Sequence, residues 1–125
     1  MVSIFISYAL DNRDYALKLD ERLRAVGFEV WIGNPNDPGE KWWRPTARAI
    51  KDCGAFIVIM TADSLKSELV QLEVSLAVGY DKPIFPLLLE GKVWDTFAHT
   101  PYENVRDGNL PPAPFYEKLT QHAPR

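Results

Sequence analysis

The stretch Ala55–Met60 constrains the fold of this chain more than any other, because all six of its residues are apolar. The sequence Ala-Phe-Ile-Val-Ile-Met shows no alternation of polar and apolar positions. A strand without a polar face has to be covered on both sides, which is typical of a central strand in a parallel sheet. We therefore expect a sheet built around this stretch, with helices on both of its faces.

Shorter apolar runs on either side predict the rest of the sheet. A strand, an amphipathic helix and a second strand follow one another from the N-terminus, and this order is a βαβ unit with parallel strands. Gly27 is suited to end the helix of this unit. The expected strands are Val2–Tyr8, Phe28–Ile32, Ala55–Met60, Ile84–Leu89 and a short Tyr102–Val105. The expected helices cover residues 12–26, Trp42–Lys51, with Pro45 in its first turn, Ser64–Tyr80, and a short segment with Phe115 and Leu119.

This alternation predicts an α/β fold of the flavodoxin-like kind. The architecture is a three-layer sandwich, in which a central parallel sheet of four to five strands has helices on both faces. With 125 residues, of which 46% are hydrophobic, the chain can bury one core. We take residues 1–122 as a single domain and residues 123–125 as a tail or the start of a linker.

The composition argues against several classes of function. The net charge of −3 gives no basic footprint for a nucleic-acid partner. The single Cys53 excludes an internal disulfide and a cysteine zinc cluster, and the two histidines, His99 and His122, lie far apart in the tail, so no metal site is expected. The sequence has neither an N-terminal signal pattern nor an apolar run of about 20 residues, so we expect a cytoplasmic domain without a membrane partner.

One carboxylate lies within the apolar stripe of the helix expected at Ser64–Tyr80. At about 100° per residue, Glu73 falls about 40° from Leu69, on the side of Ala77. A carboxylate there is costly unless it has partners or a function. Glu73 either reaches solvent from the edge of the stripe or serves a function, and the helical phase alone leaves both possibilities open.

The expected sheet places Glu73 on the side where ligands bind. In open parallel sheets, ligands bind beyond the carboxyl ends of the strands, which here lie near residues 7–8, 31–32, 61–62 and 89–90. Glu73 lies two turns into the helix that starts beside one of these ends. The segment Gly33–Lys41, rich in proline, glycine and asparagine, follows another of them, and long loops of this kind are often functional.

Several short motifs, in this order and spacing, resemble the TIR (Toll/interleukin-1 receptor) domain family. The resemblance covers about Val2 to Gly91, and the tail around residues 102–116 looks more weakly like that of prokaryotic members. The motifs are Phe5-Ile6-Ser7-Tyr8 with Asp11, Leu23 with Gly27-Phe28 and Val30-Trp31, Pro38-Gly39-Glu40 with Trp42 or Trp43, Ile50 to Ile59, and Ser67 with Leu69 and Glu73.

The resemblance implies two possible functions. Many TIR domains hydrolyse NAD⁺ at the nicotinamide–ribose bond, and Glu73 stands where they have their catalytic glutamate. The product is ADP-ribose or a cyclic isomer, and NAD⁺ is a substrate, so no cofactor is implied. Other members only self-associate. The chain is thus expected to be an NAD⁺ hydrolase of a bacterial immune or antiphage defence protein, or a non-catalytic module for homotypic protein–protein interaction.

The resemblance also implies site residues and partners. The positions expected to bind substrate are Ser7, Tyr8, Ala9, Trp31, Ile32, Ser67 and Leu69. The expected self-association loop, the family's BB loop, includes Asn34, Pro38, Gly39, Glu40 and Trp42. Its partners are other TIR domains in a homo-oligomer or filament, together with a fused sensor or oligomerisation domain outside this chain. The sequence departs from the family at Leu69, where many members have an aromatic residue, and at Ile32-Gly33, where many have an acidic one.

A third possibility is an unrelated flavodoxin-like domain. A phospho-receiver needs an acidic pair after its first strand and an aspartate at the end of its third, but this chain has Ser7-Tyr8 and Met60-Thr61 there. A nucleoside deoxyribosyltransferase also uses a carboxylate at a glycosidic carbon, but it lacks this order of motifs. Both are therefore set aside.

Overall fold

The sheet of this protein has five parallel strands with helices on both faces. The computed structural model describes residues 3–33 and 40–123, except for the side chains of residues 40–42. The strands are β1 (Ser3–Ser7), β2 (Glu29–Ile32), β3 (Ala55–Met60), β4 (Ile84–Leu88) and β5 (Glu103–Asn104). The helices are η1 (Leu10–Asn12), α1 (Arg13–Val26), α2 (Glu40–Asp52), α3 (Ala62–Lys66), α4 (Glu68–Gly79), η2 (Asp95–Phe97) and α5 (Ala113–Thr120).

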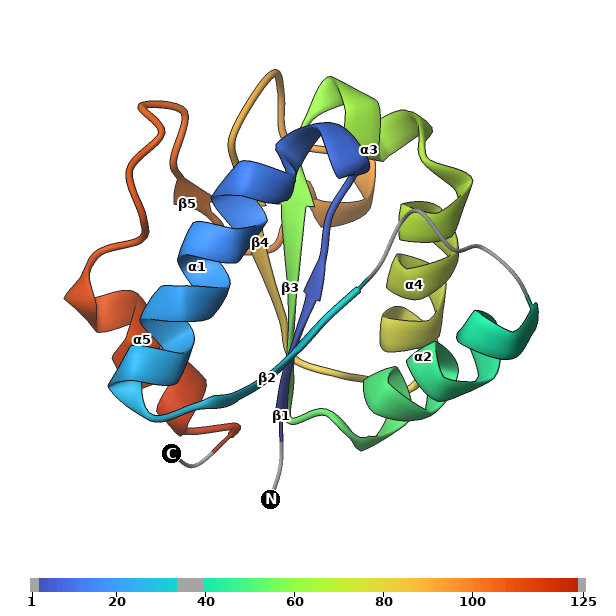
Figure 1. Cartoon of the computed structure of the whole chain (residues 1–125). Coiled ribbons are helices and arrows are strands. Elements are labelled where there is room, and N and C mark those ends of the chain that lie inside the picture. Colours follow the sequence, from blue (N-terminus) through green and yellow to red (C-terminus); the bar gives the residue numbers. More distant parts are fainter. Residues whose placement is uncertain (1–2, 34–39, 124–125) are drawn as a thin grey trace.

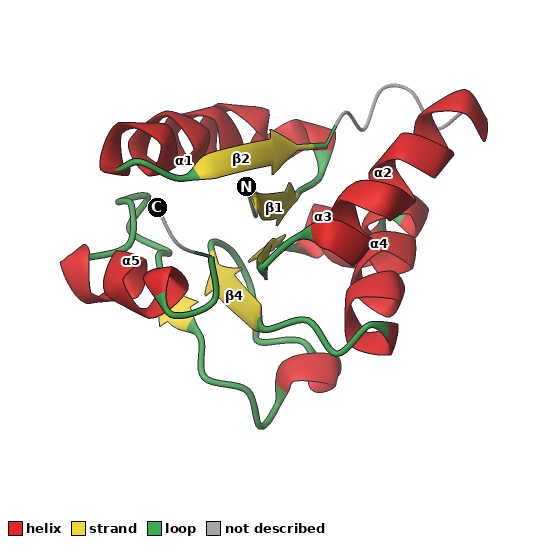
Figure 2. Cartoon of the chain, turned by 90° about the horizontal axis from the view of Figure 1, so that it is seen from below, coloured by secondary structure: helices red, strands yellow, loops and turns green. Residues whose placement is uncertain are grey.

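The strand order is β2-β1-β3-β4-β5, and each strand runs parallel to its neighbours. The chain therefore leaves β1 toward one edge of the sheet and returns on its other side to form β3. This is the flavodoxin-like order, whose switch point between β1 and β3 is where ligands bind. The predicted α/β class is confirmed, with α1 and α5 on one face of the sheet and α2 and α4 on the other (Figures 1 and 2).

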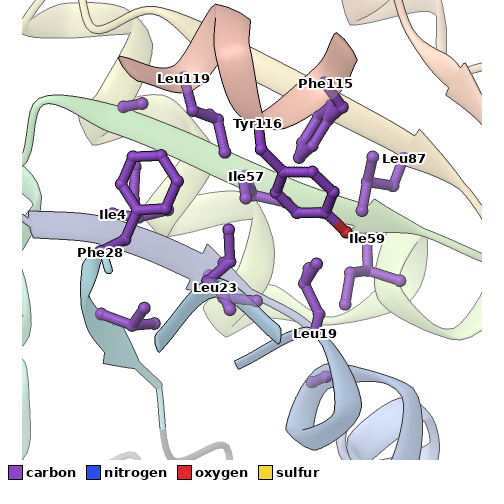
Figure 3. Packing of buried hydrophobic residues seen from close by; sticks show 14 of the residues in the cluster. Ile4, Leu19, Leu23, Phe28, Ile57, Ile59, Leu87, Phe115, Tyr116 and Leu119 are labelled. Carbon is purple, nitrogen blue, oxygen red and sulfur yellow. The ribbon is translucent and has the colours of Figure 1, made fainter. Parts of the chain in front are cut away.

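The core has two halves, one on each face of the sheet. All six residues of β3 are buried, as the sequence predicts, and they alternate between the halves. Ile57 and Ile59 face α1 and α5, where they pack with Leu19, Leu23 and Phe115 (Figure 3). The other half lies between the sheet and helices α2 and α4. Its members include Phe5, Ile50, Cys53, Phe56, Val58, Met60, Val70, Val74 and Ala77.

The first βαβ unit forms as expected. Helix α1 ends at Gly27, whose φ of 112° is the left-handed conformation that glycine adopts readily. Its N–H donates to the carbonyls of Leu23 and Arg24. Strand β2 then forms one edge of the sheet, and the Arg24 guanidinium donates to the Val30 carbonyl at 2.7 Å.

The single helix predicted over Ser64–Tyr80 is wrong, because the chain breaks into α3 and α4 at Ser67. Ser67 is extended, with φ −77° and ψ 118°, and its hydroxyl accepts from the Val70 N–H at 3.2 Å. Thr61 caps α3 in the same way by accepting from the Ser64 N–H at 3.0 Å. Hydroxyl side chains that bond to nearby backbone compete with a continuous helix, which explains the break.

The buried stripe of α4 also differs from the predicted one. Its buried residues are Val70, Glu73, Val74 and Ala77, whereas Leu72 is 53% exposed. The buried side of α4 lies nearer Val70 and Val74 than Leu72, because packing against β1 and α2 sets which side of the helix faces the core. Pro45 also lies deeper than its predicted first-turn position, as the sixth residue of α2, because this helix begins at Glu40.

Candidate active site

Glu73 meets Ser7 at the carboxyl end of β1. Ser7 is the last residue of β1 and points to the same face as Phe5, which is the face that α4 covers. Its hydroxyl donates to Glu73 Oε1 at 2.7 Å. Ser7 is fully buried and Glu73 is 2% exposed, so the interpretation of Glu73 as an edge residue that reaches solvent is wrong.

Burial controls the charge of Glu73. It raises the pKa of this carboxyl from 4.5 to about 8, while the hydrogen bond from Ser7 acts in the opposite direction. At neutral pH the carboxyl of the unliganded protein is therefore mostly protonated. Among the residues that the structure describes, no donor or acceptor reaches Oε2, so one oxygen of the carboxyl is not used by the fold.

Gly33, which follows β2, lies beside this second oxygen. A Cβ atom built on Gly33 would lie 3.4 Å from Glu73 Oε2 and 3.8 Å from the Ile6 carbonyl. The Gly33 carbonyl accepts from the Tyr8 hydroxyl at 2.7 Å. From the sequence, Gly33 is expected only to begin the loop Gly33–Lys41 and to depart from the family pattern. Because residues two apart in a strand share a face, the sequence could place Gly33 on the same face as Trp31. Its approach to Glu73, in contrast, depends on tertiary packing.

Tyr8 reaches the site through its hydroxyl, and Ala9 belongs to the segment that follows it. The Tyr8 ring packs with Ile4 and Ile6 on the other face of the sheet, and only its hydroxyl reaches Gly33. Burial raises the Tyr8 pKa, the charge of Arg13 lowers it, and Glu73 raises it. Ala9 is buried and precedes η1 as its N-cap residue, and its carbonyl accepts from the Asn12 N–H.

The other predicted substrate-binding residues are divided between the two faces. Trp31 is half-buried and packs on the Glu73 face, whereas Ile32 packs on the opposite face. Ser67 caps α4, and the half-buried Leu69 lies one turn before Glu73 on the same helix. The structure therefore joins Ser7 directly to Glu73, places Trp31 on the same face, and directs Ile32 away.

The expected self-association loop lies largely outside the described residues. Asn34, Pro38 and Gly39 belong to the range that the structure does not describe. Glu40 and Trp42 lie in the first turn of α2, and their side chains are also outside the described part.

A hollow of about 520 Å³ opens at the same end of the sheet, beyond the carboxyl ends of β3 and β4. Its lining includes Thr61, Leu65, Glu90, Lys92 and Trp94. In the described ranges 3–33 and 40–123, no group of three or more histidine, cysteine or acidic side chains could hold a metal. Within the same ranges, no helix is long and apolar enough to cross a membrane.

Solved structures with a similar fold include the following three. The TIR domain of the Toll-related receptor TRR-2 from Hydra magnipapillata superposes with a TM-score of 0.73 at 20% identity, over 97% of both chains. The CMP N-glycosidase BcmB from Clostridium botulinum gives 0.62 at 21% identity, over 94% of this chain and 97% of that one. The heterodimer of the RPS4 and RRS1 TIR domains gives 0.56 at 16% identity, over 86% and 72%.

These likenesses show the fold, because all three identities are low. No curated protein matches the chain. The sequence itself matches the TIR domain family over residues 4–120, from within β1 to the end of α5, and this range includes the Ser7–Glu73 pair. The chain therefore belongs to the TIR domain family.

Proposed function

We propose that this TIR domain cleaves an N-glycosidic bond of a nucleotide, that its substrate is NAD⁺, and that Glu73 is the catalytic residue. The observation that carries the proposal is the Glu73 carboxyl, which is buried at the switch point, bonded to Ser7 through Oε1, and without a partner at Oε2 among the described residues. The product is ADP-ribose or a cyclic isomer. The setting is a bacterial immune or signalling protein that acts when self-assembled.

The chemistry of NAD⁺ cleavage needs one carboxylate. The bond between ribose C1′ and the nicotinamide nitrogen breaks, and the electron pair leaves with nicotinamide, which changes from a cation to a neutral molecule. No general acid is needed, unlike the reaction of ordinary glycosidases. The positive charge that develops on the ribose is stabilised by an anion held in place, which is the role of ionised Glu73. In hydrolysis, a water oxygen then bonds to C1′ and its proton goes to solvent.

The protonation state that Glu73 needs depends on the substrate. A cationic nicotinamide ring beside the carboxyl lowers its pKa, so NAD⁺ itself favours the ionised form. A neutral base such as cytosine leaves more readily when it is protonated, and a carboxyl with a pKa of about 8 holds a proton at neutral pH. The fold shared with a CMP N-glycosidase therefore makes CMP the second substrate to test.

The experiment measures release of nicotinamide from NAD⁺, and of cytosine from CMP, with the chain alone and after forced oligomerisation. We expect NAD⁺ turnover in the assembled protein and a loss of about a hundredfold or more in Glu73→Ala. Ser7→Ala should lower turnover less, because it removes the hydrogen bond but leaves the carboxyl. Turnover of NAD⁺ by Glu73→Ala at the wild-type rate would show that Glu73 is not catalytic.

A non-catalytic interaction module is the second candidate, and exposed apolar side chains favour it. Leu65 on α3 and Leu72 on α4 are 50% and 53% exposed. The loop with Pro38 and Gly39 stays the predicted contact between copies. That TIR domains can pair is supported by the RPS4 and RRS1 TIR domains, which form a heterodimer. This candidate requires self-association that Gly39 substitutions weaken, with no turnover of NAD⁺ or CMP in any assembly state.

A further inference from the structure

A second hollow, which we call the β4–α5 hollow, lies away from Glu73. Its volume is about 330 Å³. It is lined by residues 84–86 of β4, residues 101–103 at the start of β5, and residues 115–122 of α5 and the turn that follows it. Phe85 and Phe115 pack on the face of the sheet that α1 and α5 cover, whereas Glu73 belongs to α4 on the other face. The proposed reaction at Glu73 therefore makes no use of this hollow.

The β4–α5 hollow exists because β5 is much shorter than β4. Strand β4 pairs with β3 over all of Ile84–Leu88, but it pairs with β5 only at Leu87 and Leu88. Pro101 stands just before β5, and a proline has no N–H to donate to a neighbouring strand. Among the described residues, no strand therefore lies beside the first half of β4 on this side, and α5 forms the opposite wall.

Ring side chains make up much of the lining. Phe85 is at their centre, because its ring centroid lies 5.9 Å from that of Phe115 and 5.8 Å from that of His122. Phe115 is buried and Phe85 is half-buried, whereas Tyr102 is 45% exposed. Ring side chains that the fold covers only in part offer stacking surfaces to a planar ligand, and every nucleobase has such a planar face.

The polar side chains of the hollow differ between its walls. Lys118 and Gln121 belong to the α5 wall, and Glu103 belongs to the β5 wall. Among the described residues, Lys118 forms no ion pair, so its charge is not neutralised by the fold. Lys118 only donates hydrogen bonds, Glu103 only accepts them when ionised, and Gln121 does both. A matching ligand therefore has an anionic group at one end and N–H donors at the other.

We propose that the β4–α5 hollow binds a mononucleotide, with its base among the rings, the amino group of the base toward Glu103 and the phosphate toward Lys118. A volume of about 330 Å³ is near the lower end of the range for small-molecule pockets, so it suits one small molecule and not a folded segment of a partner. A simple aromatic acid has no donor for Glu103, and a sugar phosphate has no ring to stack.

The probe is adenosine 5′-monophosphate (AMP), and the two histidines of the chain report where it binds. In protein labelled with ¹³C at histidine, we expect AMP to shift the NMR signal of His122, which lines the hollow, and to leave that of His99, which does not. The same shift should appear in Glu73→Gln, because the site does not include the carboxyl. A His122 signal that millimolar AMP leaves unchanged would show that the proposal is wrong.

Tyr102→Ala tests the stacking surface. Tyr80→Ala is the matched control, since Tyr80 is 44% exposed, like Tyr102 with 45%, and lies at the end of α4 outside the hollow. We expect Tyr102→Ala to weaken AMP binding by about fivefold or more. Tyr80→Ala should stay within about twofold of wild type. Equal affinities of the two variants for AMP would overturn the proposed place of the base.

Lys118→Gln tests the phosphate contact. It should weaken AMP binding by about threefold or more and change the binding of adenosine, which has no phosphate, by less than about twofold. The control is Lys66→Gln on α3, which also removes one exposed lysine. An equal loss for AMP and adenosine would contradict the phosphate contact. If Tyr102→Ala instead weakens self-association in sedimentation and leaves AMP binding intact, the hollow is a contact between copies and the proposal fails.

Discussion

At the scale of single residues, the buried carboxyl of Glu73 lowers the stability of the fold. It is buried on the inner face of α4, where an apolar residue would pack without any cost of desolvation. Ser7 compensates through one hydrogen bond to Oε1, and Oε2 is left without a described partner. Proteins commonly hold such perturbed groups where their chemistry is needed, and pay elsewhere in the fold.

The cost of Glu73 predicts how stability depends on pH. Its pKa in the folded protein is about 8, above the ordinary value of 4.5, so the folded state holds the proton more tightly than the unfolded state. This contribution to stability is complete below about pH 4.5 and is lost as the pH rises through 8. Glu73→Gln keeps a neutral side chain, so its stability relative to wild type should rise by about 1.4 kcal/mol per pH unit between these values.

Urea unfolding of wild type and Glu73→Gln at pH 5, 6, 7 and 8 measures this difference. The exposed Glu117→Gln on α5 is the control for the loss of one carboxylate. A constant difference between wild type and Glu73→Gln over this range would mean that the carboxyl is ionised in the folded protein.

At the scale of elements, the packing of α4 against β1 and α2 determines which of its residues face inward. Glu73 and Val74 are buried, whereas Leu72 is 53% exposed. The angles between these residues are the same in any α-helix, with or without the break at Ser67. The pattern of apolar residues does not determine which side of the stripe faces the sheet, and this is why the predicted stripe included Leu72.

Loss of the Ser67 cap should lower stability. Ser67→Ala removes the acceptor for the Val70 N–H, which should cost about 1 kcal/mol. Ser75→Ala is the control, because Ser75 is exposed on the outer face of α4, where alanine favours the helix. The free energies of unfolding from urea titrations compare the two variants. Equal stabilities would show that the cap does not hold the start of α4.

At the scale of the whole molecule, the central strand was the most predictable feature and the site the least. Ala55–Met60 is apolar at every position, so its burial on both faces follows from local sequence. The contact of Ser7 with Glu73 joins residues 66 positions apart, and that of Gly33 with Glu73 depends on how α4 packs across β1. Local patterns placed these residues at one end of the sheet, but only tertiary packing brings them together.

The two-sided core also predicts where substitutions are costly. Ile57 is fully buried in β3, between β1 and β4, so Ile57→Ala should destabilise the protein by about 2–5 kcal/mol and Ile57→Val by about 1 kcal/mol. Leu17→Ala on α1, where the side chain is 42% exposed, should change stability by about 0.5 kcal/mol or less. Thermal unfolding orders the three variants, and a Leu17→Ala as costly as Ile57→Ala would contradict this division of the core.

The contact of Arg24 with β2 has a consequence for the tendency of the protein to aggregate. An edge strand offers unpaired backbone groups that can add a strand from another molecule, and such additions lead to aggregation. Here the guanidinium of Arg24, which is also bonded to Asp20 at 2.8 Å, occupies the outward carbonyl of Val30 at this edge. Arg24, which is held by α1, thus places a positive charge at the β2 edge of the sheet. This charge hinders the pairing of β2 with a strand of another molecule.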